Sequence, residues 1–368
     1  MTILIAGCVL SSFAVSCLST AAIRRIALRW GLIDQPNVSR KIHATPTPLG
    51  GGIAIWVGIV LPLLAAELIV RWIGPDSVPA WFPEDFATHL RGVISKSGQL
   101  WIIVGGGTVI SILGLIDDKM TLRWQPKLLV QFVVAGGLVA AGVRATVFMQ
   151  AEWVGIALSV LWIVVLTNAF NFLDNMDGLS SGIGLIASVM FAVVMLTGTS
   201  EPRWFVAAFL LILSGSLAGF LVHNWPPAKI FMGDSGSCLI GMLLASLTIV
   251  GTFFEYGKSS GKHVLLAPLC ILAVPLYDFC SVVTIRLLQG RSPFHADRQH
   301  FSHRLVELGL SRPKAVLTIY LVTMTTGLGA LLLYEVTSWT AAFLVLALIA
   351  CTLAVIAIIE TVGRRKSQ

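Results

Sequence analysis

Residues 152–178 read EWVGIALSVLWIVVLTNAFNFLDNMDG, and this stretch decides the class of fold. Its first part, 152–168, is apolar apart from Glu152 and Asn168 at its two ends, and a helix of this length crosses most of a hydrocarbon core about 30 Å thick. Its second part carries an Asn or Asp at every third position. The stretch therefore predicts a membrane-spanning helix that ends in a group of polar side chains.

Apolar runs of this kind recur along the whole chain of 368 residues. Hydrophobic residues make up 56% of the sequence and charged residues 12%, whereas a soluble domain carries about 25% charged residues. A water-soluble globule is excluded, and we predict an all-α polytopic membrane protein whose single integral-membrane domain covers 1–368. We expect about eleven transmembrane helices, over 2–22, 51–70, 98–116, 127–143, 152–168, 179–198, 204–222, 236–254, 264–287, 315–334 and 339–360.

Basic residues predict the orientation of these helices. Lys and Arg gather in alternate connections between the apolar runs. Because cytoplasmic loops are enriched in basic residues, we place these connections and the C-terminus in the cytoplasm and the N-terminus outside. The first run lacks the positive n-region of a cleavable signal peptide, so we expect it to remain as a span. The predicted cytoplasmic segments are 23–50, 117–126, 169–178, 223–235, 288–314 and the tail after 360.

The formal net charge of +7 follows from this topology and does not indicate a nucleic-acid partner. No basic helix or aromatic-interleaved basic patch accompanies the charge, so no nucleic-acid binding is expected. The six cysteines lie in or beside apolar runs and form no C-x-x-C pair. They are typical of core thiols and indicate neither a metal site nor a disulfide framework.

Most aspartates fall on the predicted cytoplasmic side, although no topology rule places them there. Only Asp76 and Asp85 lie outside. Carboxylates at the ends of spans are costly to desolvate unless a cation or a hydrogen-bond donor meets them. The pattern predicts a cytoplasmic site for a metal ion and a phosphorylated ligand. The aspartates on this side are Asp34, Asp117, Asp118, Asp174, Asp177, Asp234, Asp278 and Asp297.

The segment GLIDDKMTLRWQPKLLVQ, residues 114–131, ends the third predicted span with Asp117 and Asp118. Adjacent carboxylates favour a shared cation, and hard oxygen ligands suit Mg2+ or Mn2+. A solvated helix cap explains such a pair equally well. Lys127 is either a phosphate ligand or a marker of topology.

The motif NAFNFLDNMDGLS places Asn168, Asn171, Asp174 and Asp177 three residues apart. Neighbours in such a series share a helix face, and we expect the helix to end within the motif, near Gly178. Two amides and two carboxylates can coordinate a cation or read the edge of a nucleobase. A polar loop that caps the next helix is the plainer alternative.

The segment HNWPPAKIFMGDSGS, residues 223–237, brings Asn224 and Asp234 to the start of the eighth predicted span. Gly233 and Gly236 would allow a ligand to approach the backbone, and the amides of the helix N-terminus form a natural anion site. The alternative is that Asp234 is a plain N-cap. Further on, Asp278 lies inside a span and calls for a partner such as Arg286.

Two further loops carry candidate phosphate contacts. The loop GRSPFHADRQHFSHRLVELGLS contains Arg298, His300 and His303. Two His at i and i+3 could bind zinc, but no third soft ligand is near, and the arginines favour an anion. In RKIHATPTPLGGG, His43 precedes a turn rich in Pro and Gly, where a structural turn and a phosphate contact are equally supported.

Taken together, these segments resemble the polyprenyl-phosphate N-acetylhexosamine-1-phosphate transferases. Six motifs carry the resemblance in order: RKIHATPTPLGG, DDKMTLRWQPKLLVQ, NAFNFLDNMDGL, FMGDSGS, PLYD and DRQH. The last loop looks like the bacterial N-acetylglucosamine branch, which starts teichoic acid, lipopolysaccharide O-antigen and related cell-wall glycans. One position departs from that branch, because Ser302 stands where its His-x-His-His cluster has the middle histidine.

The resemblance implies residue roles. Asp117, Asp118 and Asp234 would be catalytic, with Asp234 as the main Mg2+ ligand and Asp118 beside the metal; Mn2+ is an alternative ion. Asn171, Asp174 and Asp177 would contact the nucleotide. We expect Asp117 to orient the acceptor or the metal more than to remove a proton. The expected substrate-binding residues are Asn168, Asn171, Asp174, Asp177, Asn224, Lys127, His43, Arg298, His300 and His303.

The implied reaction transfers N-acetylglucosamine 1-phosphate from UDP-N-acetylglucosamine to undecaprenyl phosphate and releases UMP. It would take place at the cytoplasmic face of the bacterial inner membrane, among membrane lipids; a homodimer is left open. One alternative is the phospho-N-acetylmuramoyl-pentapeptide transferase of peptidoglycan synthesis. A secondary transporter belongs to a different class, and it would place acids near the middle of the membrane within inverted repeats.

Overall fold

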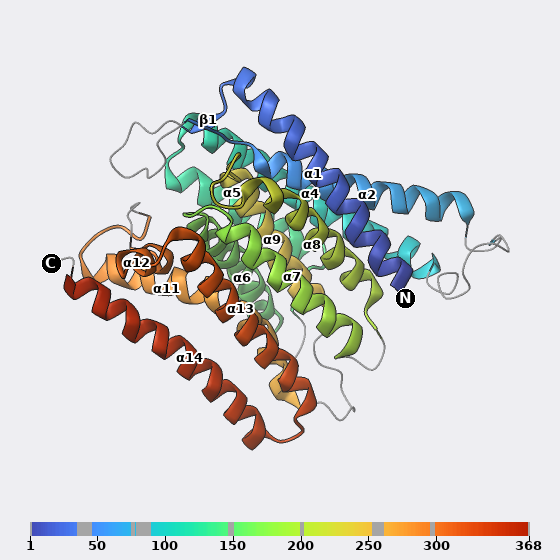
Figure 1. Cartoon of the computed structure of the whole chain (residues 1–368). Coiled ribbons are helices and arrows are strands. Elements are labelled where there is room, and N and C mark those ends of the chain that lie inside the picture. Colours follow the sequence, from blue (N-terminus) through green and yellow to red (C-terminus); the bar gives the residue numbers. More distant parts are fainter. Residues whose placement is uncertain are drawn as a thin grey trace.

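A computed structural model describes residues 2–34, 46–74, 78, 90–145, 151–198, 202–251, 261–294 and 299–366, with side chains described as far as 359. Helices dominate this part of the chain (Figure 1). The elements are α1 Thr2–Trp30, β1 Ile33–Asp34, β2 Thr47–Pro48, α2 Gly51–Ile73, α4 Leu90–Met120, α5 Trp124–Ala140, α6 Glu152–Leu173, α7 Leu179–Thr197, α8 Trp204–Asn224, α9 Asp234–Val250, η1 Lys262–Leu266, α10 Ala267–Ile271, α11 Ala273–Leu288, α12 Phe301–Glu307, α13 Arg312–Glu335 and α14 Trp339–Lys366.

The predicted class of an all-helical polytopic membrane protein is confirmed. Among the described residues, eight helices are long and apolar enough to cross a membrane, namely α1, α2, α4, α6, α7, α8, α13 and α14. The segments Lys262–Ile271 and Ala273–Leu288 form a further pair, bent by 67°, and α5 and α9 are shorter apolar helices. Within the described residues, each predicted apolar run overlaps one of these helices or, for 264–287, the bent pair. The all-α expectation misses one small feature, the antiparallel pair of β1 and β2.

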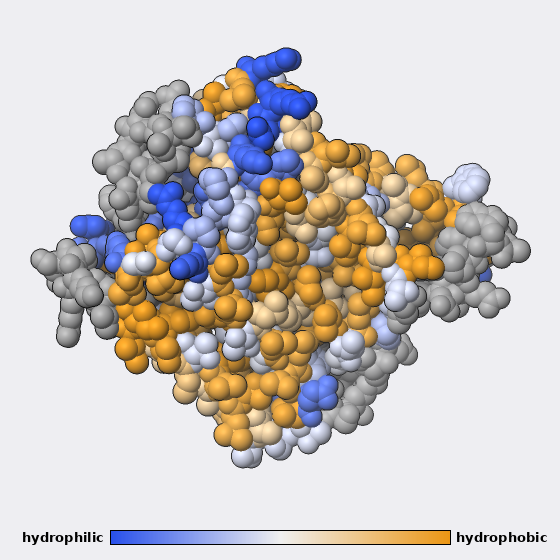
Figure 2. Space-filling view, in the orientation of Figure 1, coloured by the Kyte–Doolittle hydropathy of each residue, from blue (hydrophilic) through white to orange (hydrophobic). Residues whose placement is uncertain are grey.

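The outer surface is suited to lipid. Large apolar side chains such as Leu129 and Val133 on α5 and Leu344 on α14 are each more than 60% exposed. Figure 2 shows apolar residues over most of the visible face, with hydrophilic residues gathered around the C-terminal end of α1. A soluble protein rarely exposes so large an apolar surface, whereas a bilayer covers it.

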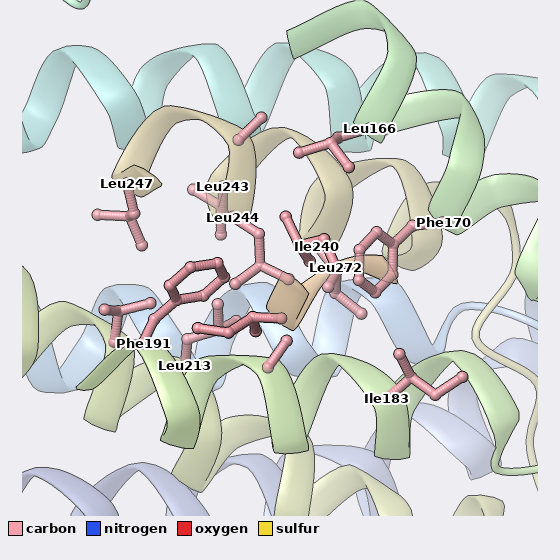
Figure 3. Close-up of a cluster of buried hydrophobic side chains, with 14 of the residues drawn as sticks. Leu166, Phe170, Ile183, Phe191, Leu213, Ile240, Leu243, Leu244, Leu247 and Leu272 are labelled. Carbon is pink, nitrogen blue, oxygen red and sulfur yellow. The ribbon is translucent and has the colours of Figure 1, made fainter. Parts of the chain in front are cut away.

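Helix α9 lies at the centre of the bundle. All of its residues from Ser235 to Thr248 are buried, and it contacts α2, α4, α6, α7 and α8. Figure 3 shows its leucines and Ile240 interleaved with Phe170 of α6 and Phe191 of α7. A helix that is apolar all round belongs in a protein interior. Its first residue, Asp234, is therefore fixed at one end of the bundle.

Glycines bring α2 and α4 against the start of α9. A Cβ on Gly114 of α4 would lie 2.4 Å from the Ser235 backbone nitrogen, and one on Gly52 of α2 would lie 2.3 Å from the Gly236 nitrogen. Side chains at these two positions would force the helices apart. The close approach of α4 places Asp117 and Asp118, one turn after Gly114, beside Asp234.

Candidate active site

Asp117 closes the turn between α4 and α5. One of its oxygens accepts a hydrogen bond from the Leu122 amide (2.6 Å), and the other accepts one from the Lys127 ammonium (2.7 Å). The turn passes through Thr121, whose φ of 51° is the left-handed conformation. This reversal returns the chain along α4, so that Lys127 faces Asp117 although ten residues separate them in sequence.

Lys127 also joins Asp234. Its Nζ lies 3.2 Å from Asp234 Oδ2, so one ammonium bridges two carboxylates that come from α4 and α9. The side chains are 26% exposed for Lys127, 11% for Asp117 and 30% for Asp234. Partly buried charges are screened less by salt than exposed ones. The three residues, named here the Asp–Lys–Asp cluster, gather cationic and anionic groups at one end of the bundle.

Asp118 faces a different set of partners. The backbone amides of Asp234 and Ser235 donate to its two oxygens, at 2.8 and 3.3 Å. A helix N-terminus favours an anion, and here the anion is the carboxylate of Asp118. The expectation that these amides hold a ligand's anion is thus corrected, because a protein carboxylate occupies them.

The two glycines of the same loop are explained in the same way. Gly233 has a φ of 74°, and a Cβ there would lie 2.4 Å from Asp118 Oδ2; a Cβ on Gly236 would lie 2.9 Å from Gly52 Cα. We expected these glycines to give a ligand access to the backbone. The structure shows instead that they admit a carboxylate and a neighbouring helix of the protein itself.

A small cavity lies beside the Asp–Lys–Asp cluster. Its volume is about 20 Å³, which is room for one water molecule or one ion. Asn168 donates to Gln131 Oε1 (2.6 Å), and Asn171 donates to Ser237 Oγ (3.3 Å) and lies within hydrogen-bonding reach of Asp234. The polar residues that line it are Lys127, Gln131, Asn168, Asn171 and Asp234.

Gln131 is the lining residue that the sequence analysis missed. It is 4% exposed and lies one helical turn after Lys127 on α5. Residues four apart share a helix face. That spacing was the available signal, because a buried Gln on the same face as a candidate ligand needs a polar partner.

Asp174 and Asp177 hold the loop that precedes α9. Asp174 accepts a hydrogen bond from the Gly233 backbone, and Asp177 Oδ2 accepts one from the Ala228 amide at 3.0 Å. Helix α6 ends at Leu173, as expected within the motif, and Gly178 starts α7 in the left-handed conformation. The two acids thus link the end of α6 to the loop 225–233.

Burial raises the pKa of Asp174 well above its usual range, and the charges of Asp234 and Asp118 act in the same direction. Three carboxylates in one neighbourhood resist simultaneous ionisation. A cation bound among them would favour their charged forms.

Asn224 links two segments of the protein interior through hydrogen bonds. Its Oδ1 accepts from the Gly178 amide (3.0 Å) and the Ser181 hydroxyl (3.1 Å), and its Nδ2 donates to the Ile230 carbonyl (2.9 Å). The residue is 3% exposed. Its described hydrogen bonds connect the start of α7 to the loop 225–233, whereas the resemblance implied a contact with the substrate.

The histidine segment, residues 300–303, lies against the end of α6. His300 meets the ring of Phe172 edge-on at 6.1 Å between centroids and lies 6.3 Å from His303. Ser302, which replaces the usual middle histidine, donates a hydrogen bond to Asn175. The segment therefore contacts the end of α6 and the turn that follows it, through Phe172 and Asn175.

Asp278 is buried beside the same segment. Its carboxylate accepts hydrogen bonds from His300 Nδ1 (2.9 Å) and the Phe301 amide (2.8 Å). Arg286, the partner that we expected, donates to the Pro293 carbonyl (2.6 Å) and lies over the Phe172 ring. His43 and Arg298, two further predicted substrate contacts, lie outside the described residues.

Mg2+ requires oxygen ligands, and the site offers the carboxylates of the Asp–Lys–Asp cluster. Among the described residues, no group of three or more His, Cys, Asp or Glu side chains has the arrangement of a metal site. Mg2+ is commonly held by one or two carboxylates together with water and substrate phosphates. Asp117 and Asp234 converge on one cationic group, the Lys127 ammonium, so the carboxylates present fit Mg2+ of this kind.

The fold and the site together define an all-helical membrane protein with a partly buried charged site at one end of its bundle. Residues 100–252 match the family model described as glycosyl transferase family 4. The chain is 32% identical to a probable undecaprenyl-phosphate N-acetylglucosaminyl 1-phosphate transferase of Bacillus subtilis, over 92% of this chain and 88% of the relative. It is 34% identical to the decaprenyl-phosphate N-acetylglucosaminephosphotransferase of Mycolicibacterium smegmatis, over 87% and 80%. The chain belongs to the polyprenyl-phosphate N-acetylhexosamine-1-phosphate transferase family and is a sugar-phosphate transferase.

Proposed function

We propose that this protein transfers N-acetylglucosamine 1-phosphate from UDP-N-acetylglucosamine to undecaprenyl phosphate, as the first lipid-linked step of a cell-envelope glycan. The names of its relatives support this choice, since those of Bacillus subtilis, Mycolicibacterium smegmatis and Salmonella typhi all specify N-acetylglucosamine. The observation that carries the proposal is the Asp–Lys–Asp cluster beside a cavity lined by amides.

The reaction needs no strong base. An oxygen of the acceptor phosphate attacks the β-phosphorus of the UDP-sugar, the bond from that phosphorus to the bridging oxygen breaks, and UMP leaves with the bond's electron pair. A phosphate monoester has a second pKa of about 6 and is largely dianionic at neutral pH. Asp117 is engaged by Lys127 and the Leu122 amide, which supports an orienting role. An Asp117→Asn variant that loses only the basic limb of the pH profile would contradict that role.

Lys127 supplies positive charge where negative charge develops on the phosphates. Asp234 and Asp117 would hold Mg2+, and Asp118 stays a predicted ligand because each carboxylate oxygen keeps a second lone pair. Bound there, the ion would neutralise charge on the donor diphosphate. Asn168, Asn171, His300 and His303, together with His43 and Arg298, are the proposed substrate contacts.

We place the site at the cytoplasmic face of the inner membrane of a bacterium. In this topology the eight long helices, the bent pair and the two shorter apolar helices make eleven spans, with the N-terminus outside. Single-cysteine labelling tests it in a background without the native cysteines. Cysteine at Ala141 should react with a membrane-impermeant maleimide in intact cells, whereas cysteine at Lys119 should react only after permeabilisation. The reverse labelling pattern would contradict this topology and indicate the opposite orientation.

UMP release separates the proposed donor from the peptidoglycan one. Purified protein with Mg2+ and undecaprenyl phosphate should release UMP with UDP-N-acetylglucosamine and not with UDP-N-acetylmuramoyl-pentapeptide. An Asp234→Ala variant should release none while its elution profile stays that of the folded protein. Release with the pentapeptide donor alone would overturn the proposal. Decaprenyl phosphate, supplied in parallel, tests the lipid length, which differs between the relatives' names.

A further inference from the structure

Asp278 is a buried acid for which the mechanism above has no use. It lies on α11, is 1% exposed, and receives hydrogen bonds at both oxygens. An unpaired buried carboxylate would be costly, so its partners account for its presence. Those partners are the ring of His300 and the amide of the next residue, Phe301.

The geometry fixes one tautomer of His300. In a neutral imidazole one ring nitrogen donates and the other accepts. A carboxylate 2.9 Å from Nδ1 holds the proton there, which leaves Nε2 as the acceptor and sets the plane of the ring. The second oxygen of Asp278 holds the Phe301 amide at the start of α12, so the same carboxylate orients both the ring and its backbone.

The ring so held lies against the end of α6, the helix that carries Asn168 and Asn171. His300 contacts Phe172, which directly follows Asn171, and the neighbouring Ser302 is tied to Asn175. Within the part of the chain that the structure describes, no hydrogen bond joins Nε2 to another protein atom. Trp124 stacks on Phe294 at 4.5 Å, so the loop that leads to His300 is also attached to α5, one turn before Lys127.

We infer that Asp278 is a positioning residue that fixes the orientation and tautomer of His300 so that Nε2 meets a phosphate or sugar group of the donor. The inference rests on the proposed function, because it assigns a role to a residue of that site. Partners that orient a functional histidine typically contribute about 10- to 100-fold to activity.

A double-mutant cycle tests the coupling. Asp278→Asn should lower kcat/KM for UMP release about 10- to 100-fold. In a His300→Ala background the same change should cost less than about twofold, because the positioned group is already absent. The inference would be overturned if the losses of kcat/KM in the two single variants multiplied in the double variant. Normal activity of Asp278→Asn would also overturn it. Glu67→Gln is the matched control, since it also replaces a hydrogen-bonded carboxylate by an amide, in this case one bonded to Arg71 and Trp101. This variant should keep normal turnover.

The second measurement does not depend on activity or on an Asp278 variant. The 15N shifts of the neutral His300 ring in the unmodified protein, assigned by difference from His300→Gln, should show a protonated Nδ1 and a bare Nε2. The opposite tautomer would reject the inference. If the protein uses another donor, the proposed function fails, yet both the cycle with that donor and the ring shifts still test Asp278.

Discussion

Lys127 shows how a residue that is ambiguous in sequence acquires a defined role in the fold. A lone lysine near the end of a span is as readily a topology marker as a ligand. Its Nζ, however, lies 2.7 Å from Asp117 and 3.2 Å from Asp234, and a topology marker needs neither contact. An ammonium group held in this position can interact with the phosphate groups of a substrate.

Replacing Lys127 should therefore disable the enzyme. Lys127→Met removes the charge that separates Asp117 from Asp234, and we expect a loss of about 100- to 1000-fold in kcat, as for other electrostatic stabilisers. UMP release measures it. Lys119→Met, which removes an exposed charge from the same turn, should keep normal activity. Equal losses in the two variants would mean that the site needs only basic surface charge.

Asp118 should prove to be a stability residue as well as a site residue. Asp118→Asn replaces an acceptor of two backbone amides, and we expect a loss of about 1–3 kcal/mol of stability, seen as a lower midpoint of thermal unfolding. Asp234→Asn is the comparison, because no backbone donor of the described structure depends on its side chain. It should abolish UMP release and leave the midpoint unchanged. A normal midpoint in Asp118→Asn would refute the capping role.

At the scale of single elements, hydropathy alone predicted where the helices lie but not where they end. Helix α1 continues to Trp30 and α4 begins at Leu90, each eight residues beyond the apolar run that predicted it. Backbone hydrogen bonding carries a helix on into water, whereas an apolar run marks only its lipid-facing part. The bend of 67° between Lys262–Ile271 and Ala273–Leu288 was likewise not predicted, although Pro268 and Pro275 lie on either side of it in the run 264–287.

Two glycines on α4 should respond oppositely to alanine. Gly114→Ala would put a methyl group 2.4 Å from the backbone of α9, so the helices must separate, and we expect a loss of about 1–3 kcal/mol together with lower activity. Gly105 has open space around it, so Gly105→Ala should be neutral or stabilise by up to about 1 kcal/mol. Thermal unfolding of the pair measures both. A harmless Gly114→Ala would show that α4 does not touch α9 this closely.

For the molecule as a whole, the sequence predicted which residues gather but not what each contacts. Asp117, Asp118 and Lys127 do meet around the start of α9, and Asp278 meets His300 beside the end of α6. The roles of Asp118 and Asn224 could not be predicted, because Asp118 accepts from backbone amides at the start of α9 and Asn224 accepts from the Gly178 amide and the Ser181 hydroxyl, all distant in sequence. The spacing of charged residues says nothing about which amide a carboxylate will face.

The stability of the metal-free protein should depend on pH through Asp174. Desolvation, followed by the charges of Asp234 and Asp118, raises the pKa of this carboxyl in the folded state. The folded protein then holds a proton that the unfolded chain releases, so stability is greatest below the unfolded pKa of about 3.9 and falls as pH rises toward the folded value.

In EDTA the midpoint of thermal unfolding should therefore decline as the pH rises above about 4. Asp174→Asn should flatten the decline, and Mg2+ should protect more strongly at the alkaline end, since cation binding displaces protons. A midpoint that rises with pH in the unmodified protein would have the wrong sign for this account.

The central position of α9 has a consequence for biosynthesis. All five helices that surround it, α2, α4, α6, α7 and α8, precede it in the chain, and a nascent chain emerges from its N-terminus onward. These five helices have thus already been synthesised when translation reaches Asp234. Asp234 is then added beside Lys127, and the histidine segment is synthesised after it, followed by α13 and α14.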